Sequence, residues 1–211
     1  NATLSGTGGA SFYALTINKT SASNTITLSS NVTVTNTLTL TTGLVVTGSN
    51  TVIVTNTATG AISGGSSNSY ISGSLQRALP SSLVSGSTYV FPVGKNGSGY
   101  YPISLVNPTT GTGAVTVTAE AFAVGSGGSA GSGISSISTS EYWSVASTGN
   151  FTNSSYSVTR PTAVSPNNVI GRSTTLTGSY NSILGTAAGS SITNSTTASG
   201  AAQQFFVLAQ G

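Results

Sequence analysis

The chain has 211 residues, of which five are basic and two acidic, and it contains no His, Cys, Met or Asp. General acid–base catalysis and activated Ser or Thr nucleophiles need a titrating partner. Transition-metal and calcium sites need Cys, His or several carboxylates. We therefore predict that the protein is not an enzyme, with no catalytic residue, no metal ion and no cofactor.

The formal charge of +3 does not indicate a nucleic-acid partner. Phosphate binding requires clustered cations. The five here are scattered along the chain: Lys19, Arg77, Lys95, Arg160 and Arg172. The longest apolar run, residues 205–209, falls far short of the roughly 20 residues of a membrane-crossing helix. We predict no nucleic-acid partner and no membrane span, and we expect any signal peptide to be absent from this sequence.

Residues 25–54 alternate between apolar and polar side chains, a pattern typical of half-buried strands. Threonines fill most positions between the apolar residues, which are Ile26, Leu28, Val32, Val34, Leu38, Leu40, Leu44, Val46, Val52 and Val54. Turn-forming residues recur at 29–31, 42–43, 48–50 and 59–60. The pattern predicts a β-solenoid-like region or a tight meander over residues 1–79, with first and last rungs at 12–17 and 70–75.

Beyond residue 79, aromatic residues and prolines enter longer strand candidates that are separated by longer loops. These candidates span residues 88–91, 101–106, 114–122, 142–145, 156–160 and 203–209. Their number and spacing predict an Ig-like β-sandwich over residues 80–211, with Trp143 and Val145 facing its core. No segment is typical of a helix longer than a turn or two, so the predicted fold class is all-β.

Five strings occur in order along the chain: SFYALTIN at 11–18, LSSNVTVTNTLTLTTG at 28–43, FPVGK at 91–95, YPISL at 101–105 and SEYWSV at 140–145. This succession resembles the low-charge surface modules of Bacteroidota, found in large secreted adhesins exported by the type IX secretion pathway. The resemblance implies a cell-surface or released protein in adhesion, gliding or extracellular matrix, with no catalytic residues.

These observations favour an extracellular structural protein that forms a filament with copies of itself by β-strand addition. The candidate pairing strands contain Phe12, Tyr13, Leu15 and Ile17 near one end and Phe205, Phe206, Val207 and Leu208 near the other. The alternative is that both segments are internal strands.

Two other functions stay open at this point. One is an adhesin module that binds surface glycans or another surface by stacking them on Tyr100, Tyr101, Tyr142 or Trp143. The other is an ice-binding face built from the threonine arrays.

Two covalent modifications are also candidates. Glycosylation sequons occur at Asn1, Asn18, Asn31, Asn96, Asn150, Asn153 and Asn194. An isopeptide bond of the kind known from bacterial surface β-sandwiches would use Lys95, with Glu120 or Glu141 assisting.

Overall fold

The computed structural model describes residues 1–194 and 196–211, which form strands and one short 3-10 turn. The all-β prediction is confirmed. The elements up to position 79 are β1 (Ala2–Leu4), β2 (Ala10–Asn18), β3 (Thr25–Leu28), β4 (Val32–Thr42), β5 (Leu44–Val54), η1 (Thr59–Ala61), β6 (Ile62–Gly64) and β7 (Ile71–Leu79).

The remaining strands are shorter on average, and the loops between them are no longer on average than those of the solenoid. These strands are β8 (Thr88–Phe91), β9 (Val93–Lys95), β10 (Gly99–Tyr100), β11 (Ile103–Thr110), β12 (Val115–Phe122), β13 (Ser129–Ala130), β14 (Ser136–Ile137), β15 (Tyr142–Thr148), β16 (Phe151–Thr159), β17 (Val169–Ser173), β18 (Ser179–Ser182), β19 (Thr186–Ala188), β20 (Ser191–Thr193), β21 (Ala198–Ser199) and β22 (Gln203–Gln210).

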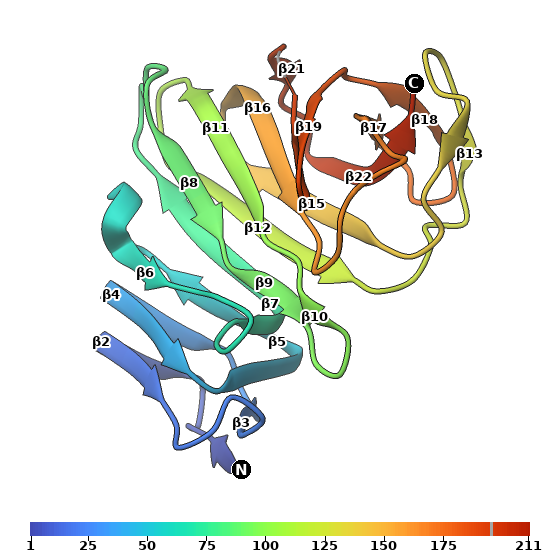
Figure 1. The fold of residues 1–211 in the computed structure, drawn as a ribbon. Coiled ribbons are helices and arrows are strands. Elements are labelled where there is room, and N and C mark those ends of the chain that lie inside the picture. The colour runs from blue at the N-terminus through green and yellow to red at the C-terminus, as the bar shows by residue number, and fades with distance from the viewer. Residues whose placement is uncertain (195) are drawn as a thin grey trace.

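The strands up to β7 stack in parallel as the rungs of a solenoid (Figure 1). One ladder joins β1, β3, β5, β7 and β9, and another joins β2, β4 and β6. Parallel pairing in register repeats the same inward position at each rung, so apolar side chains form columns. One column runs from Ile26 through Val45 and Ile71 to Val93. The solenoid-like prediction for this region is therefore confirmed.

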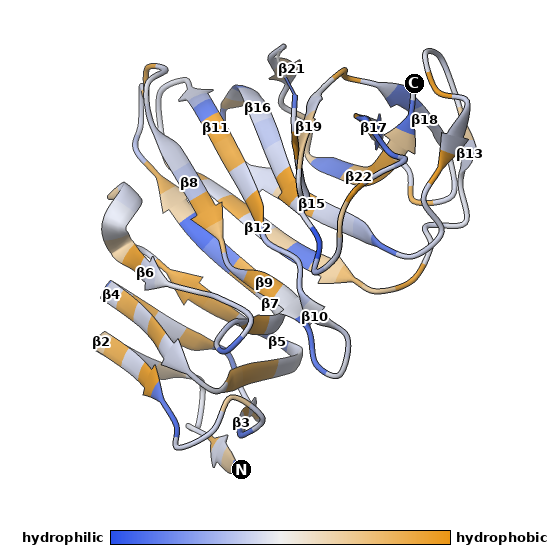
Figure 2. Cartoon of the chain, in the orientation of Figure 1, coloured by the Kyte–Doolittle hydropathy of each residue, from blue (hydrophilic) through white to orange (hydrophobic). Residues whose placement is uncertain are grey.

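The alternation of side chains sets the inner and outer faces of the rungs. Apolar and polar bands alternate along β4 in Figure 2, and its inward residues, such as Val32 and Leu38, are fully buried. The corner expected at 48–50 lies inside β5, as a register shift between Val46 and Thr51. The chain bends there without leaving the strand.

Two layers of antiparallel strands follow the solenoid. One continues from β7 through β12, β15, β22, β17 and β18, and the other has the order β19-β20-β16-β11-β8. The layers pack through their side chains, since the rings of Tyr156 and Phe206 lie 4.3 Å apart between centroids. Trp143 is fully buried and donates its Nε1 hydrogen to the carbonyl oxygen of Tyr101 at 2.8 Å. The prediction that Trp143 and Val145 face the core is confirmed.

The first sheet passes from the solenoid into the two-layer region without a break. β7 pairs in parallel with β5 on one edge, and on the other it pairs in parallel with β9 and antiparallel with β12. One hydrophobic core also contains residues from both parts, including Val34, Leu75, Val117 and Tyr156. The position predicted as a domain boundary, 79/80, coincides with the end of β7.

Candidate functional site

The first rung of the solenoid, β1 and β2, lies at one end of the molecule and is called the open rung below (Figure 1). β1 pairs with β3 and β2 pairs with β4, each along one edge only among the described residues. A strand edge without a neighbour presents a row of free N–H and C=O groups. The open rung therefore offers a template on which another strand can pair.

Apolar side chains of the open rung are incompletely covered. Phe12 stacks in register on Val34 and Leu15 on Leu38. The residues of the second rung are fully buried, whereas those of the first are half-buried. The difference arises because each inward column lacks a covering residue at its first position. A further rung would remove this apolar surface from water.

The open rung also lacks the charged side chains that usually prevent edge pairing. Residues 1–18 contain no Lys, Arg, Asp or Glu, and the first charged side chain is Lys19. Proline, which also blocks pairing, is absent from the same segment. Nine consecutive residues of β2 are therefore available as an uncharged edge.

The two segments that the sequence suggested for subunit pairing differ in their surroundings. Tyr13 on β2 is 75% exposed, while Ile17 is buried at the end of the same strand. Residues 205–208 lie in β22, which pairs with β15 on one edge and with β17 on the other. The structure corrects the prediction for 205–208, because a strand paired on both edges presents no free row of main-chain groups.

A second free edge lies in the other sheet, far from the open rung in sequence. β19 pairs with β20 only, among the described residues, and all three of its residues are exposed. Residues 186–188 contain no charged side chain. This edge, which the sequence analysis did not single out, is also accessible to a neighbouring strand.

A fully buried arginine joins the last turn of the solenoid to the edge of the second sheet. The Nη2 group of Arg77 donates to the carbonyl oxygens of Ala58 and Thr59 at 3.0 and 2.8 Å, and Nη1 donates to that of Val90 at 2.8 Å. The guanidinium lies over the ring of Tyr89, 5.1 Å from its centroid. The side chain thus supplies donors between segments that do not pair with each other.

Burial lowers the pKa of Arg77 to about 10, so the guanidinium remains charged at neutral pH. The sequence analysis grouped Arg77 with scattered cations and missed its role. The sequence could have indicated that Arg77 is buried, because Arg77 lies two residues from both Leu75 and Leu79 and therefore shares the inward face of β7 with them. A basic residue on an apolar strand face is more often buried and paired than solvated.

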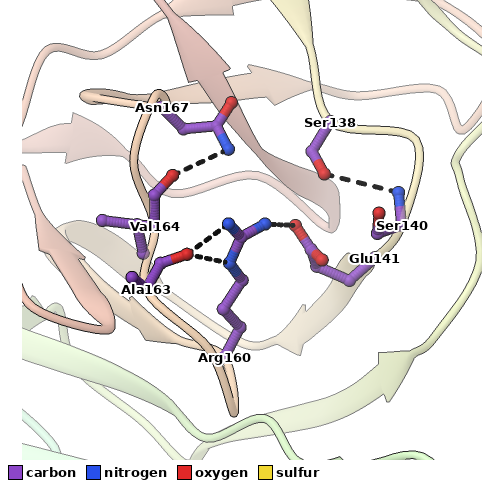
Figure 3. A network of polar contacts seen from close by, with 7 residues as sticks. All are labelled: Ser138, Ser140, Glu141, Arg160, Ala163, Val164 and Asn167. Atoms are coloured by element: carbon purple, nitrogen blue, oxygen red, sulfur yellow. Dashed lines mark hydrogen bonds and ion pairs between the residues drawn. The ribbon is translucent and has the colours of Figure 1, made fainter.

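One ion pair anchors the loop that follows β16 (Figure 3). Glu141 is 2% exposed, and its Oε1 lies 3.6 Å from Nη1 of Arg160. Arg160 also donates from Nε to the carbonyl oxygen of Ala163 at 2.9 Å, and Asn167 Nδ2 donates to that of Val164 at 3.0 Å. The contacts tie residues 160–167 to the start of β15, which is a structural use of the two charges.

The predicted modification sites fall in contrasting environments. Six of the sequon asparagines are exposed: Asn1, Asn18, Asn31, Asn96, Asn150 and Asn153. Asn194 is buried, accepts a hydrogen bond from the main-chain N–H of Tyr156 and donates to the carbonyl oxygen of Thr196. The folded protein therefore does not present Asn194 to a glycosylating enzyme.

The predicted isopeptide residues are near each other but not enclosed. Lys95 is exposed, with its Nζ 5.8 Å from the ring centroid of Phe122. Burial raises the pKa of the half-buried Glu120, and the charge of Lys95 opposes that rise. An exposed amine does not fit the water-poor setting that such a bond requires.

The aromatic residues considered as glycan platforms are largely inaccessible. Trp143 is fully buried, and Tyr142 is buried and stacks on Phe122 with ring centroids 4.4 Å apart. Tyr100 and Tyr101 are half-buried. The structure thus corrects the expectation that Tyr142 or Trp143 stacks on a sugar.

In comparisons with known proteins, no family model, curated protein or solved structure matches this chain. Within the described part of the chain, no helix is long and apolar enough to cross a membrane. The functional interpretation that follows therefore rests on the chain's own geometry and chemistry.

Proposed function

We propose that this chain is a non-enzymatic, extracellular structural protein that assembles with copies of itself by β-strand addition at the open rung. The observation that carries the proposal is the uncharged edge of β2, with half-buried Phe12 and Leu15 beside it. Strand addition extends the main-chain ladder and covers these side chains. The low charge and the resemblance to secreted surface modules support the extracellular location.

A filament needs two different edges on each subunit, because pairing of like edges closes into a dimer. We propose β19 as the second edge, since it is exposed, uncharged and paired on one side. Pairing of β2 with β19 of the next copy is heterologous and leaves a free edge at each end of the assembly. An Ig-like sandwich for residues 80–211 is also proposed, supported by the two packed antiparallel layers.

The test compares two variants that introduce the same charge at equally exposed positions. Tyr13 and Val84 are 75% and 77% exposed, and only Tyr13 lies on the open rung. Tyr13→Lys places a charge on the edge that strand addition would desolvate, so it should raise the protein concentration needed for assembly about tenfold or more. Val84→Lys should assemble like the unchanged protein.

Sedimentation velocity and negative-stain microscopy would measure the assembly. A third variant, Ala187→Pro, removes a main-chain donor from β19 and should leave at most closed dimers. Unchanged protein that remains monomeric at every concentration tested would overturn the proposal. Equal effects of Tyr13→Lys and Val84→Lys would also overturn it, because the edge would then have no special role.

A further inference from the structure

A polar pocket of about 220 Å³ is lined by residues of β17 and β18 and their flanking loops. Figure 1 shows these two strands well away from the open rung. The lining residues of the pocket are Arg172, Ser173, Thr174, Ser179, Asn181 and Ile183. One guanidinium, three hydroxyl groups, one amide and one aliphatic side chain therefore meet in one cavity. None of these residues was singled out as a binding residue by the sequence.

Arg172 is held in place by a buried side chain of the neighbouring strand β22. Its Nε donates to Oε1 of Gln204 at 2.6 Å, and its Nη2 donates to the carbonyl oxygen of Ser199 at 2.7 Å. Gln204 is fully buried and donates from Nε2 to the hydroxyl of Tyr156 at 3.1 Å. A guanidinium has five N–H donors, so the two that are engaged fix its orientation and leave the others for a ligand.

Both carboxylates of the chain lie beside other cations. Glu141 pairs with Arg160, and the charge of Lys95 acts on the pKa of Glu120. Arg172 has no ion pair within the described part of the chain. The pocket therefore holds a positioned cation with no acidic partner of its own.

The remaining lining suits a sugar. Oδ1 of Asn181 accepts a hydrogen bond from the main-chain N–H of Ser132 at 2.8 Å, which orients this side chain and leaves its amide donors available. Hydroxyls from Ser173, Thr174 and Ser179 match the donors and acceptors of a hydroxylated ring. Ile183 offers an apolar surface for the C–H groups of that ring.

The geometry points to a binding site for an acidic monosaccharide unit, whose carboxylate pairs with Arg172 and whose hydroxyls meet the serine, threonine and asparagine side chains. A carboxylate carries one negative charge and matches the single guanidinium, with which it forms charge-assisted hydrogen bonds. The site needs no metal and no aromatic platform. It is separate from strand addition, because neither β2 nor β19 contributes to its lining.

Titration of D-glucuronate into 15N-labelled protein tests this assignment by NMR. Glucuronate should shift the resonances of Ser173, Ser179 and Asn181, and it should bind about tenfold more tightly than D-glucose. The Arg172→Gln variant should lower the affinity for glucuronate to that for glucose. Lys95→Gln removes the same charge elsewhere and should change the affinity by less than about twofold.

Three outcomes would overturn the proposal. One is the absence of shifts at the pocket, and another is equal binding of glucuronate and glucose. The third is inorganic sulfate binding as tightly as glucuronate, which would identify a general anion site. If Arg172→Gln does not give a folded spectrum, Ser179→Leu at an exposed position replaces it. It should fill the pocket and abolish binding, and retained binding would contradict the site.

Discussion

The few charged side chains of this protein are used at particular places in the structure. Arg77 is fully buried and donates to three main-chain carbonyls, and Glu141 is buried beside Arg160. Arg172 is positioned by a buried glutamine at the wall of a pocket. Arg77, Glu141, Arg160 and Arg172 thus each have a local structural role, because few other groups are available to satisfy buried polar atoms.

Replacement of Arg77 should destabilise the protein more than replacement of an exposed cation. Arg77→Met fills a similar volume but removes the donors to Ala58, Thr59 and Val90, which should lower the free energy of unfolding by about 3 kcal/mol. Arg77→Lys supplies a smaller donor and should give an intermediate loss. Urea unfolding measures both, with Lys95→Gln as the exposed control; equal losses in all three would contradict the bridging role.

Individual rungs are held by corner residues as well as by their apolar columns. Nδ2 of Asn56 donates to the carbonyl oxygen of Asn36 at 3.1 Å, and these residues are 20 positions apart. The main-chain N–H of Thr51 donates to Oδ1 of Asn31 at 2.9 Å, across the same separation. Both contacts follow the offset of 20 residues that pairs β4 with β5, as Val32 pairs with Val52.

Substitution of Gly64, at the end of β6, tests how closely the backbones of neighbouring rungs approach each other. Its φ is +76°, and a Cβ there would lie 2.0 Å from the carbonyl oxygen of Leu40 on the neighbouring rung. Gly64→Ala should therefore lower the free energy of unfolding by about 2 kcal/mol or more. Gly48 has a φ of +60° with no atom within 4 Å of the same position, so Gly48→Ala should cost only about 1 kcal/mol. Urea unfolding curves compare them, and equal losses would argue against the close contact.

The whole molecule combines a solenoid that has an open first rung with two antiparallel layers at its other end. β7 connects the parallel solenoid to the antiparallel layers through its strand pairing. Arg77 adds a second connection, because it donates hydrogen bonds both to Thr59 of η1 and to Val90 of β8. The first rung keeps a free edge, whereas β7 at the junction is paired on both edges. The proposed assembly at the open rung would involve no charged side chain of that rung, so added salt should weaken it little.

Between acidic and neutral pH, the stability of the whole molecule should depend on pH mainly through Glu120. Burial raises the pKa of this carboxyl above its usual value of 4.5. The folded state then binds the proton more tightly than the unfolded state. The free energy of unfolding should consequently fall as pH rises from 4.5 through the folded pKa, and level off above it.

Urea unfolding between acidic and neutral pH measures this slope. Glu120→Gln should flatten it and raise stability at neutral pH, because no charge is then desolvated. Lys95→Gln should steepen it, because the charge that opposes the pKa rise is removed. An unchanged slope in Glu120→Gln would assign the pH dependence to another group.

Local pattern alone was enough to predict the solenoid-like stack and most of its inner faces, because side-chain alternation is a property of neighbouring residues. It also located Trp143 in the core and the β2 segment at which assembly is proposed. It missed the inward Val45 and Thr47 and the strands β17 to β21. Tertiary structure decided which strand edges are free: β22 is enclosed between β15 and β17, while β19 is exposed. Whether a strand edge is free depends on strands far away in the chain, and so do the burial of Asn194 and Arg77 and the pocket at Arg172. The alternation of neighbouring side chains does not encode these distant pairings.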